Sequence, residues 1–256
     1  MGRPGRRITK ELLKKFIYER KIDFVVANGE NLSGGKGLTL DSANEMFQCG
    51  IDVITGGNHI WANKEIFNII DINSRILRPA NYPEGVDVPG RGSGIYTAKN
   101  GVKIGVLNLI GRIFLGNFDC PFRIAIKEVA KIKEETSLII VDFHAEATSE
   151  KVAMGWYLAE KVTAVIGTHT HIQTADEVIL NNYTAYITDV GMTGPYDSVI
   201  GVRKDIILKT FLQQIPTRHE LGSGDLRFCG AIIDADPDSG RASSIERVRI
   251  DLDKDM

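Results

Sequence analysis

The sequence predicts an α/β fold in which short buried strands alternate with amphipathic helices. Two observations lead to this prediction. Several apolar runs are short, rich in β-branched residues and nearly unbroken, as expected of strands that are buried on both faces. Segments with helical spacing of apolar residues separate most of these runs. In such folds ligands bind where the carboxyl ends of the strands meet, so the residues that follow each run are the candidates for function.

The predicted elements follow one another along the chain. Strands are predicted over residues 24–27, 53–54, 104–109, 138–141 and 162–166, and helices over residues 10–19, 41–47 and 124–135. Near the carboxyl end, residues 230–234 and 245–251 alternate apolar and polar side chains around a Pro-Asp-Ser-Gly turn, which predicts a β-hairpin. The glycine-rich segments 2–7 and 34–37 lack the spacing of phosphate-binding loops, so we expect turns that lead into helices there.

Side chains that suit metal ions follow four of the apolar runs. They lie in Asn28-Gly29-Glu30-Asn31, Gly57-Asn58-His59, Phe143-His144 and Gly167-Thr168-His169-Thr170-His171. A single histidine at a strand end is commonly a hydrogen-bonded structural residue. However, alternation with a period of two would place His169 and His171 on the same side of an extended segment, which favours a shared metal site. His219 has no such neighbours, and we expect it to be solvated.

The mixture of ligand types indicates a particular chemistry. A carboxylate such as Glu30 can bridge two cations, the Asn58 amide offers a neutral oxygen, and neutral imidazoles bind Fe, Mn, Zn or Ni. Two cations about 3.5–4 Å apart can stabilise both the attacking and the leaving oxygen of a phosphoryl group. His59 directly follows Asn58, and an imidazole beside the metals suits the general acid that protonates a leaving group.

Together these residues carry a family resemblance. In order and spacing, the motifs resemble those of the calcineurin-like binuclear metallophosphoesterases. Within this superfamily, the sequence most closely resembles the bacterial YmdB-type phosphodiesterases. This closer resemblance rests on residues 78–83, 142–150 and 188–197, and it extends over residues 2–247. It implies a four-layer α/β/β/α sandwich that hydrolyses small phosphodiesters, among them 2',3'-cyclic or 3',5'-cyclic nucleotides.

The resemblance also implies a role for each candidate residue. Glu30 would bridge two metal ions, expected to be Fe or Mn, with Zn as the alternative. One ion would be completed by Asn58, His144 and His169, and the other by His171 with Asn31. A hydroxide bridging the metals would attack phosphorus, and His59 would act as the general acid.

The amino terminus departs from the family pattern. Family members begin with an apolar strand that ends in Gly-Asp, and this Asp is a ligand of the first metal, whereas the sequence here opens with Met1-Gly2-Arg3-Pro4-Gly5. We therefore expect the first strand and its carboxylate to be missing. A start codon assigned inside the reading frame is the simplest explanation, and natural truncation or deliberate shortening are the alternatives. The chain as printed should then be less stable, and its first metal should bind more weakly.

Composition predicts one domain over residues 1–256, with residues 81–120 as a small cap-like subregion. The net charge of −2 argues against broad nucleic-acid binding. Apolar runs are shorter than the ~18 residues of a membrane span, and no signal-like segment opens the chain, so we expect a cytoplasmic protein without membrane partners. We expect the three cysteines to be reduced and structural, and the enzyme to form a homo-oligomer.

The sequence thus predicts a binuclear metal phosphodiesterase, with two alternatives. One is a phosphomonoesterase with the same site, and the other is a metal- and nucleotide-binding regulatory protein with little turnover. Loops 81–94 and 192–201 are candidates for the walls of a substrate pocket. In that case Phe118 or Tyr196 would stack on a base, and otherwise both are packed loop aromatics.

Overall fold

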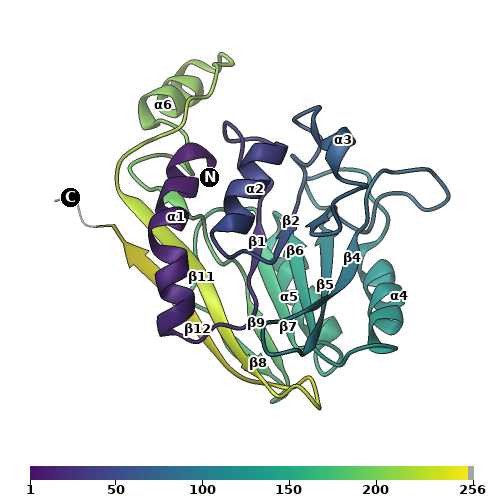
Figure 1. Cartoon of the computed structure of the whole chain (residues 1–256). Helices are drawn as coiled ribbons and strands as arrows, with labels where there is room; N and C mark the ends of the chain where they lie inside the picture. The colour runs from purple at the N-terminus through teal and green to yellow at the C-terminus, as the bar shows by residue number, and fades with distance from the viewer. Residues whose placement is uncertain (253–256) are drawn as a thin grey trace.

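A computed structural model describes residues 1–252, and its strands form three sheets with helices around them (Figure 1). The central sheet has six strands in the order β4-β5-β6-β7-β9-β8. Its inner strands are parallel, and the two edge strands β4 and β8 run antiparallel to their neighbours. The strands are β4 (Ser93–Thr97), β5 (Lys103–Ile110), β6 (Ile139–His144), β7 (Ala164–Thr168), β8 (Val178–Leu180) and β9 (Thr184–Ile187).

Two smaller sheets pack on one face of the central sheet. One is parallel, in the order β1 (Val26–Asn28), β2 (Val53–Thr55) and β3 (Ile76–Leu77). The other is antiparallel and contains β10 (Gly194–Pro195), β11 (Leu226–Ala235) and β12 (Ala242–Asp251). Val53 of the first packs with Val106 of the central sheet, and Ala242 of the second packs with Ala164. The predicted carboxyl-terminal hairpin is confirmed as β11 and β12.

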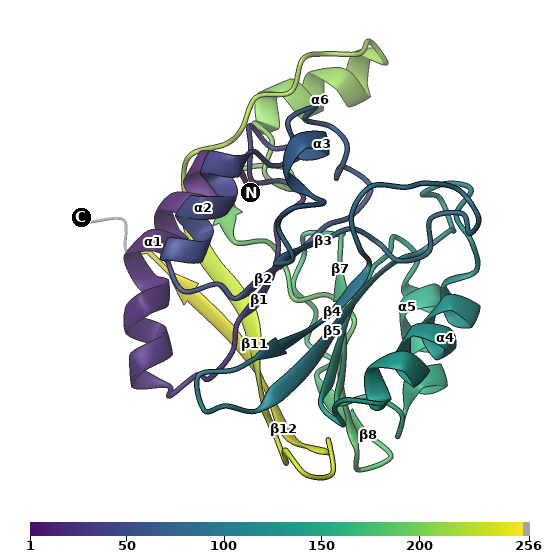
Figure 2. The same cartoon turned by 45° about the vertical axis from the view of Figure 1, so that its right-hand side comes forward.

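Helices cover the outer faces. α4 (Pro121–Lys133) and α5 (Thr148–Leu158) pack on the central sheet, and α1 (Gly2–Glu19) and α2 (Leu40–Gln48) pack beside the smaller sheets. Successive side chains of a strand point to opposite faces, so Leu107 of β5 joins the core under α4 and α5, whereas its neighbour Val106 faces the smaller sheets. The short α3 (Ile66–Ile69) lies near the top of the molecule, and α6 (Lys204–Gln213) extends from the body (Figure 2).

All of the strands and helices that the sequence predicts are present, with shifted ends. The prediction for the amino-terminal segment is wrong. Residues 2–7 form the first turns of α1 rather than a turn before it, and the Gly2 N–H donates to the carbonyl of Asn31 at 2.7 Å. Residues 34–37 form a turn, as predicted.

The predicted single domain and cap-like subregion stay predictions. Within residues 81–120, β4 and β5 belong to the central sheet, so a cap could be formed only by the loops at residues 81–92 and 111–120. None of the helices in residues 1–252 combines the length and the apolarity that crossing a membrane requires.

Candidate metal centre

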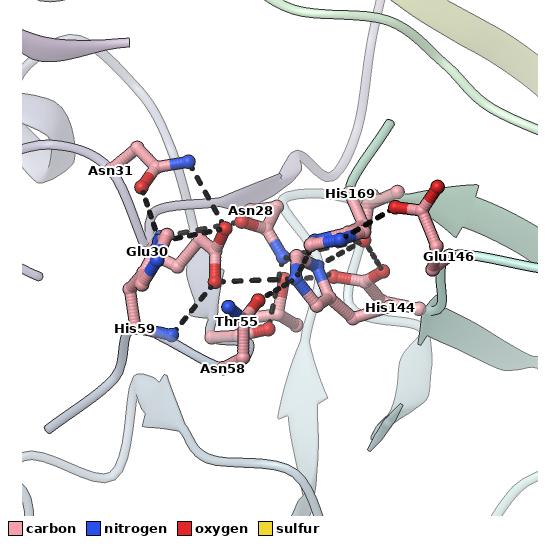
Figure 3. A network of polar contacts seen from close by, with 12 residues as sticks. Asn28, Glu30, Asn31, Thr55, Asn58, His59, His144, Glu146 and His169 are labelled. Carbon is pink, nitrogen blue, oxygen red and sulfur yellow. Dashed lines mark hydrogen bonds and ion pairs between the residues drawn. The ribbon is translucent and has the colours of Figure 1, made fainter. Parts of the chain in front are cut away.

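The polar residues predicted from the sequence converge where β1, β2, β6 and β7 end (Figure 3). This happens because the parallel strands of the small sheet and of the central sheet present their carboxyl ends at one rim. Glu30 is the carboxylate at the middle of the site, with an exposed fraction of 1%. One ligand atom each from Glu30, His144 and His169 lies within 4.8 Å of the other two. This spacing allows all three residues to contact one metal ion.

His144 makes the closest contacts within this group. Its Nε2 atom lies 3.2 Å from Glu30 Oε2, 2.9 Å from Asn58 Oδ1 and 3.0 Å from His169 Nδ1. Two nitrogen atoms and two oxygen atoms therefore face one another. Such a group of borderline ligands suits a transition metal.

A second group lies on the other side of Glu30. The Asn31 amide nitrogen donates to Glu30 Oε1 at 3.0 Å and lies 3.2 Å from His171 Nε2. The Asn31 amide oxygen lies 3.1 Å from His59 Nδ1. A metal ion between Glu30 and His171 would require this amide to turn over so that its oxygen faces them. Glu30 is common to both groups.

His144 is oriented by a chain of hydrogen bonds behind the site. The Thr168 hydroxyl donates to Asp142 Oδ1 at 2.7 Å and lies 2.9 Å from His144 Nδ1. A hydroxyl has one hydrogen, so Nδ1–H of His144 must donate to the Thr168 oxygen. This arrangement directs the Nε2 atom of His144 towards Glu30, as a metal-binding histidine requires.

Burial and neighbouring charges shift the pKa values of the ionisable groups. Burial by itself would raise the pKa of Glu30, but the His144 and His59 imidazoles hold that pKa well below its usual range. Burial by itself would lower the pKa of His144, but the Glu30 carboxylate raises that pKa above its usual value. Burial and the charge of His144 lower the pKa of His169 to about 4. At neutral pH the His169 imidazole is therefore uncharged and has a lone pair for a metal.

The backbone of the two neighbouring histidines differs from the prediction. β7 ends at Thr168, and His169 and His171 adopt left-handed conformations with φ of 102° and 66°. The segment is thus not extended, and the alternation argument that placed both imidazoles on one side is wrong. His169 reaches the Glu30–His144 group, whereas His171 reaches Asn31 and the carbonyl of Ile200.

A cavity of about 350 Å³ opens beside the site, between α1, β1 and β11. Apolar side chains such as Phe16, Val26 and Ile232 line most of it, and Glu30 and His144 are among its polar lining residues. Within residues 1–252, β1 pairs with β2 and with no other strand. Its second edge therefore borders this cavity.

Comparison with known proteins places the chain in a family. A family model described as YmdB-like protein matches residues 1–248. The chain belongs to the YmdB-like protein family. It is 47% identical over 253 residues to the 2',3'-cyclic-nucleotide 2'-phosphodiesterase of Bacillus subtilis, and the match covers 99% of this chain and 95% of the relative.

Two solved structures of similar length resemble this YmdB-like chain. A hypothetical protein from Thermus thermophilus has a TM-score of 0.91 at 36% identity, covering 98% of this chain and 96% of the other. A protein titled as a novel phosphatase, from Mycoplasma pneumoniae, has a TM-score of 0.91 at 32% identity, covering 98% and 90%. The fold is therefore a mixed α/β fold of several sheets that closely matches that of a protein described as a phosphatase.

Some residues that shape the site of this YmdB-like protein were missed by sequence reasoning. Thr55 and Thr168 both donate to the Asp142 carboxylate, and no local signal marks a threonine at a strand end as a partner of a distant aspartate. Asp142 orients His144 through Thr168, whereas the neighbouring carboxylate of Glu146 contacts His169 Nε2 at 3.0 Å.

The two aromatic residues considered for base stacking are packed against protein groups. Phe118 lies edge-on against Tyr82, with ring centroids 5.2 Å apart. The hydroxyl of Tyr196 lies 3.3 Å from Cys229 Sγ, and the guanidinium of Arg227 lies over its ring. These contacts favour the second alternative, in which both side chains are packed loop aromatics. As predicted, His219 is exposed and lies outside the site.

Proposed function

We propose that this protein is a metal-dependent phosphodiesterase that acts on small phosphodiesters. The observation that supports the proposal is the shared position of Glu30 between two groups of metal-binding side chains. A carboxylate with an exposed fraction of 1% that is flanked by imidazoles and amides is an arrangement that suits a pair of cations.

The residues fit the metal ions that the family implies. Gly57 lies against Glu30 and His144, and a Cβ atom there would lie 2.3 Å from Glu30 Oε2. The glycine therefore keeps open the space next to the ligand atoms. We assign Glu30, Asn58, His144 and His169 to one ion and Glu30, Asn31 and His171 to the other. Fe or Mn is the expected metal, with Zn as the alternative.

When bound, a pair of such cations supplies Lewis-acid stabilisation of the phosphoryl charge and a nucleophile that is active at neutral pH. The chain itself supplies the proton for the leaving group. His59 Nδ1 lies 3.1 Å from Asn31 Oδ1, and the His59 amide donates to Glu30 Oε2 at 3.1 Å. These contacts hold the half-buried imidazole beside the centre, where His59 can protonate the departing oxygen as general acid.

For the substrate we propose cyclic nucleotides, with the 2',3'-cyclic class first. The Bacillus subtilis relative is named as a phosphodiesterase for that class, and its match covers 99% of this chain. A phosphomonoesterase with the same site and a regulatory binding protein with little turnover are the less favoured alternatives. The expected homo-oligomer stays a prediction, which light scattering of the purified protein checks.

One assay separates these functions. The Mn²⁺-loaded protein is incubated with bis-p-nitrophenyl phosphate, with p-nitrophenyl phosphate and with a 2',3'-cyclic nucleotide. We expect faster turnover of the diester than of the monoester, and opening of the cyclic nucleotide at the 2' oxygen to give the 3'-monophosphate. Faster turnover of the monoester would indicate a phosphomonoesterase. Nucleotide binding without any turnover would indicate a regulatory protein.

We also propose that the packing of helices on sheets is the four-layer α/β/β/α sandwich of the family, and that the cavity beside β1 is the place of its first strand. Two features support this. The cavity has apolar walls from α1 and β11, and it is also lined by Glu30 and His171, beside which the carboxylate of that strand would serve as a ligand. Adding an apolar strand that ends in Gly-Asp before Met1 should raise the melting temperature and the metal content. If neither changes, the cavity is not the site of that strand.

A further inference from the structure

A buried ion pair lies behind the metal centre and takes no part in the functions assigned above. Lys151 Nζ on α5 lies 2.7 Å from Asp189 Oδ2, and both side chains have an exposed fraction of 1%. Removing two charges from water is unfavourable unless each finds close partners. A pair at this depth therefore needs an explanation in terms of what its charges contact.

The Asp189 carboxylate is directed at the residue between the two candidate metal ligands. Its Oδ2 atom accepts from the Thr170 N–H at 3.0 Å and from the Thr170 hydroxyl at 2.7 Å. Its Oδ1 atom accepts from the Gly191 N–H at 2.8 Å. Lys151 balances the charge, so the carboxylate stays a strong acceptor for three other donors.

The segment that Asp189 holds has an unfavourable backbone. His169 and His171 have φ of 102° and 66°, and left-handed conformations are uncommon for residues with a side chain. Such conformations persist only where surrounding contacts impose them. Both Thr170 bonds lie between these two residues, so releasing Thr170 would let the two imidazoles leave their positions.

We propose that Asp189, with Lys151 as its counter-charge, is the positioning residue of the metal centre. It clamps Thr170 and thereby directs His169 to the group around His144 and His171 to the group around Asn31. Thr170 is the connecting residue in this clamp. The inference rests on the proposed function only in that it treats the two histidines as metal ligands.

The test compares two threonines that both bond to Asp189. Thr170→Val removes the hydroxyl that reaches the carboxylate. Thr174→Val is the matched control, because its hydroxyl accepts from the Asp189 N–H at 2.9 Å and so contacts the backbone of Asp189 rather than the clamp. Thr170→Ser keeps the hydroxyl and should rescue the first variant. Lys151→Met combined with Asp189→Leu removes both charges together, so that neither remains buried without a partner.

Two measurements are made on each variant. Mn²⁺ binding is measured by titration calorimetry, and hydrogen exchange of the residue 170 amide is measured by NMR in the metal-free protein. We expect Thr170→Val and the double variant to weaken Mn²⁺ binding by about 10-fold or more and to speed exchange at residue 170. Thr170→Ser should restore binding, and Thr174→Val should bind Mn²⁺ as the wild type does, even if both valine variants melt at a similarly lower temperature.

Two results would overturn the clamp. One is wild-type Mn²⁺ binding by Thr170→Val and by the double variant. The other is an equal loss of binding in Thr174→Val, which would show that any destabilisation near Asp189 has the same effect. If the wild type binds no Mn²⁺, the proposed function fails instead, and hydrogen exchange at residue 170 alone then decides whether Asp189 holds the segment.

Discussion

Replacing Gly57 by alanine should disrupt the metal centre without disturbing the fold. Gly57 follows β2, and a Cβ atom at this position would lie 2.3 Å from Glu30 Oε2 and 2.4 Å from His144 Nε2. Ordinary van der Waals contacts begin at 3.4 Å, so the added methyl group and the side chains of Glu30 and His144 must move apart by about 1 Å. The backbone at Gly57 is outside the left-handed region, so alanine adds no conformational strain there.

The expected loss follows from these distances. A displacement of about 1 Å from productive geometry costs on the order of 100-fold in rate, and here both displaced groups are proposed ligands. We therefore expect Gly57→Ala to lower turnover of bis-p-nitrophenyl phosphate by about 100-fold, in the presence of saturating Mn²⁺, and to weaken Mn²⁺ binding. The assay is steady-state turnover together with titration calorimetry.

Gly230→Ala is the matched control, since nothing lies within 4 Å of a Cβ atom at that position. It should keep wild-type turnover and Mn²⁺ affinity. If Gly57→Ala binds Mn²⁺ and turns over the diester as the control does, Glu30 and His144 tolerate the methyl group. The proposed crowding of ligands around Gly57 would then be wrong.

Three further predictions concern the roles of single residues. Glu30→Ala should empty both metal sites because the Glu30 carboxylate is shared, whereas His169→Ala should weaken metal binding at one site. Metal analysis of the purified variants checks this. Undiminished metal content in Glu30→Ala would contradict the bridging role. His59→Ala should keep its metal but lose about 10²–10⁴-fold in kcat. The loss in kcat should be smaller for leaving groups that need no proton, such as p-nitrophenolate. An equal loss for all leaving groups would assign His59 to positioning alone. In the metal-free folded protein the pKa of His169 is about 4, below the usual value for histidine. As the pH falls from that usual value towards 4, the unfolded chain therefore binds the proton more readily than the folded chain. The contribution of His169 to the free energy of unfolding falls accordingly as the pH drops. The melting temperature of the chelated wild type should therefore fall more than that of His169→Ala between about pH 7 and about pH 5, and identical slopes would refute the depressed pKa.

Much of the fold followed from local patterns in the sequence. Apolar runs and helical spacing predicted the inner strands and the main helices. A strand that is buried on both faces has an unbroken apolar run, whereas a helix that is buried on one face repeats its apolar residues with the helical period. Boundaries were less predictable. β6 continues through Asp142 and Phe143 to His144, because each of these residues pairs with β5 and β7, and this pairing is invisible in the apolar run itself.

The sequence alone determined which residues gather at the centre. Glu30, Asn58 and His144 each stand at or just after the end of a parallel strand, and strand ends of a layered α/β fold share one rim. Placing a residue at that rim requires only the position of its strand, which the apolar pattern supplies. The family resemblance rests on the same motifs and adds the expected role of each residue.

Only the tertiary structure decided how these residues face one another. The left-handed turns at His169 and His171 send the two imidazoles to different groups, where the alternating pattern predicted one side. Asp189 reaches Thr170 across 19 positions and Lys151 across 38. Such contacts depend on hydrogen-bond geometry between segments that are distant in the chain, and a local pattern of residue types carries no information about that geometry.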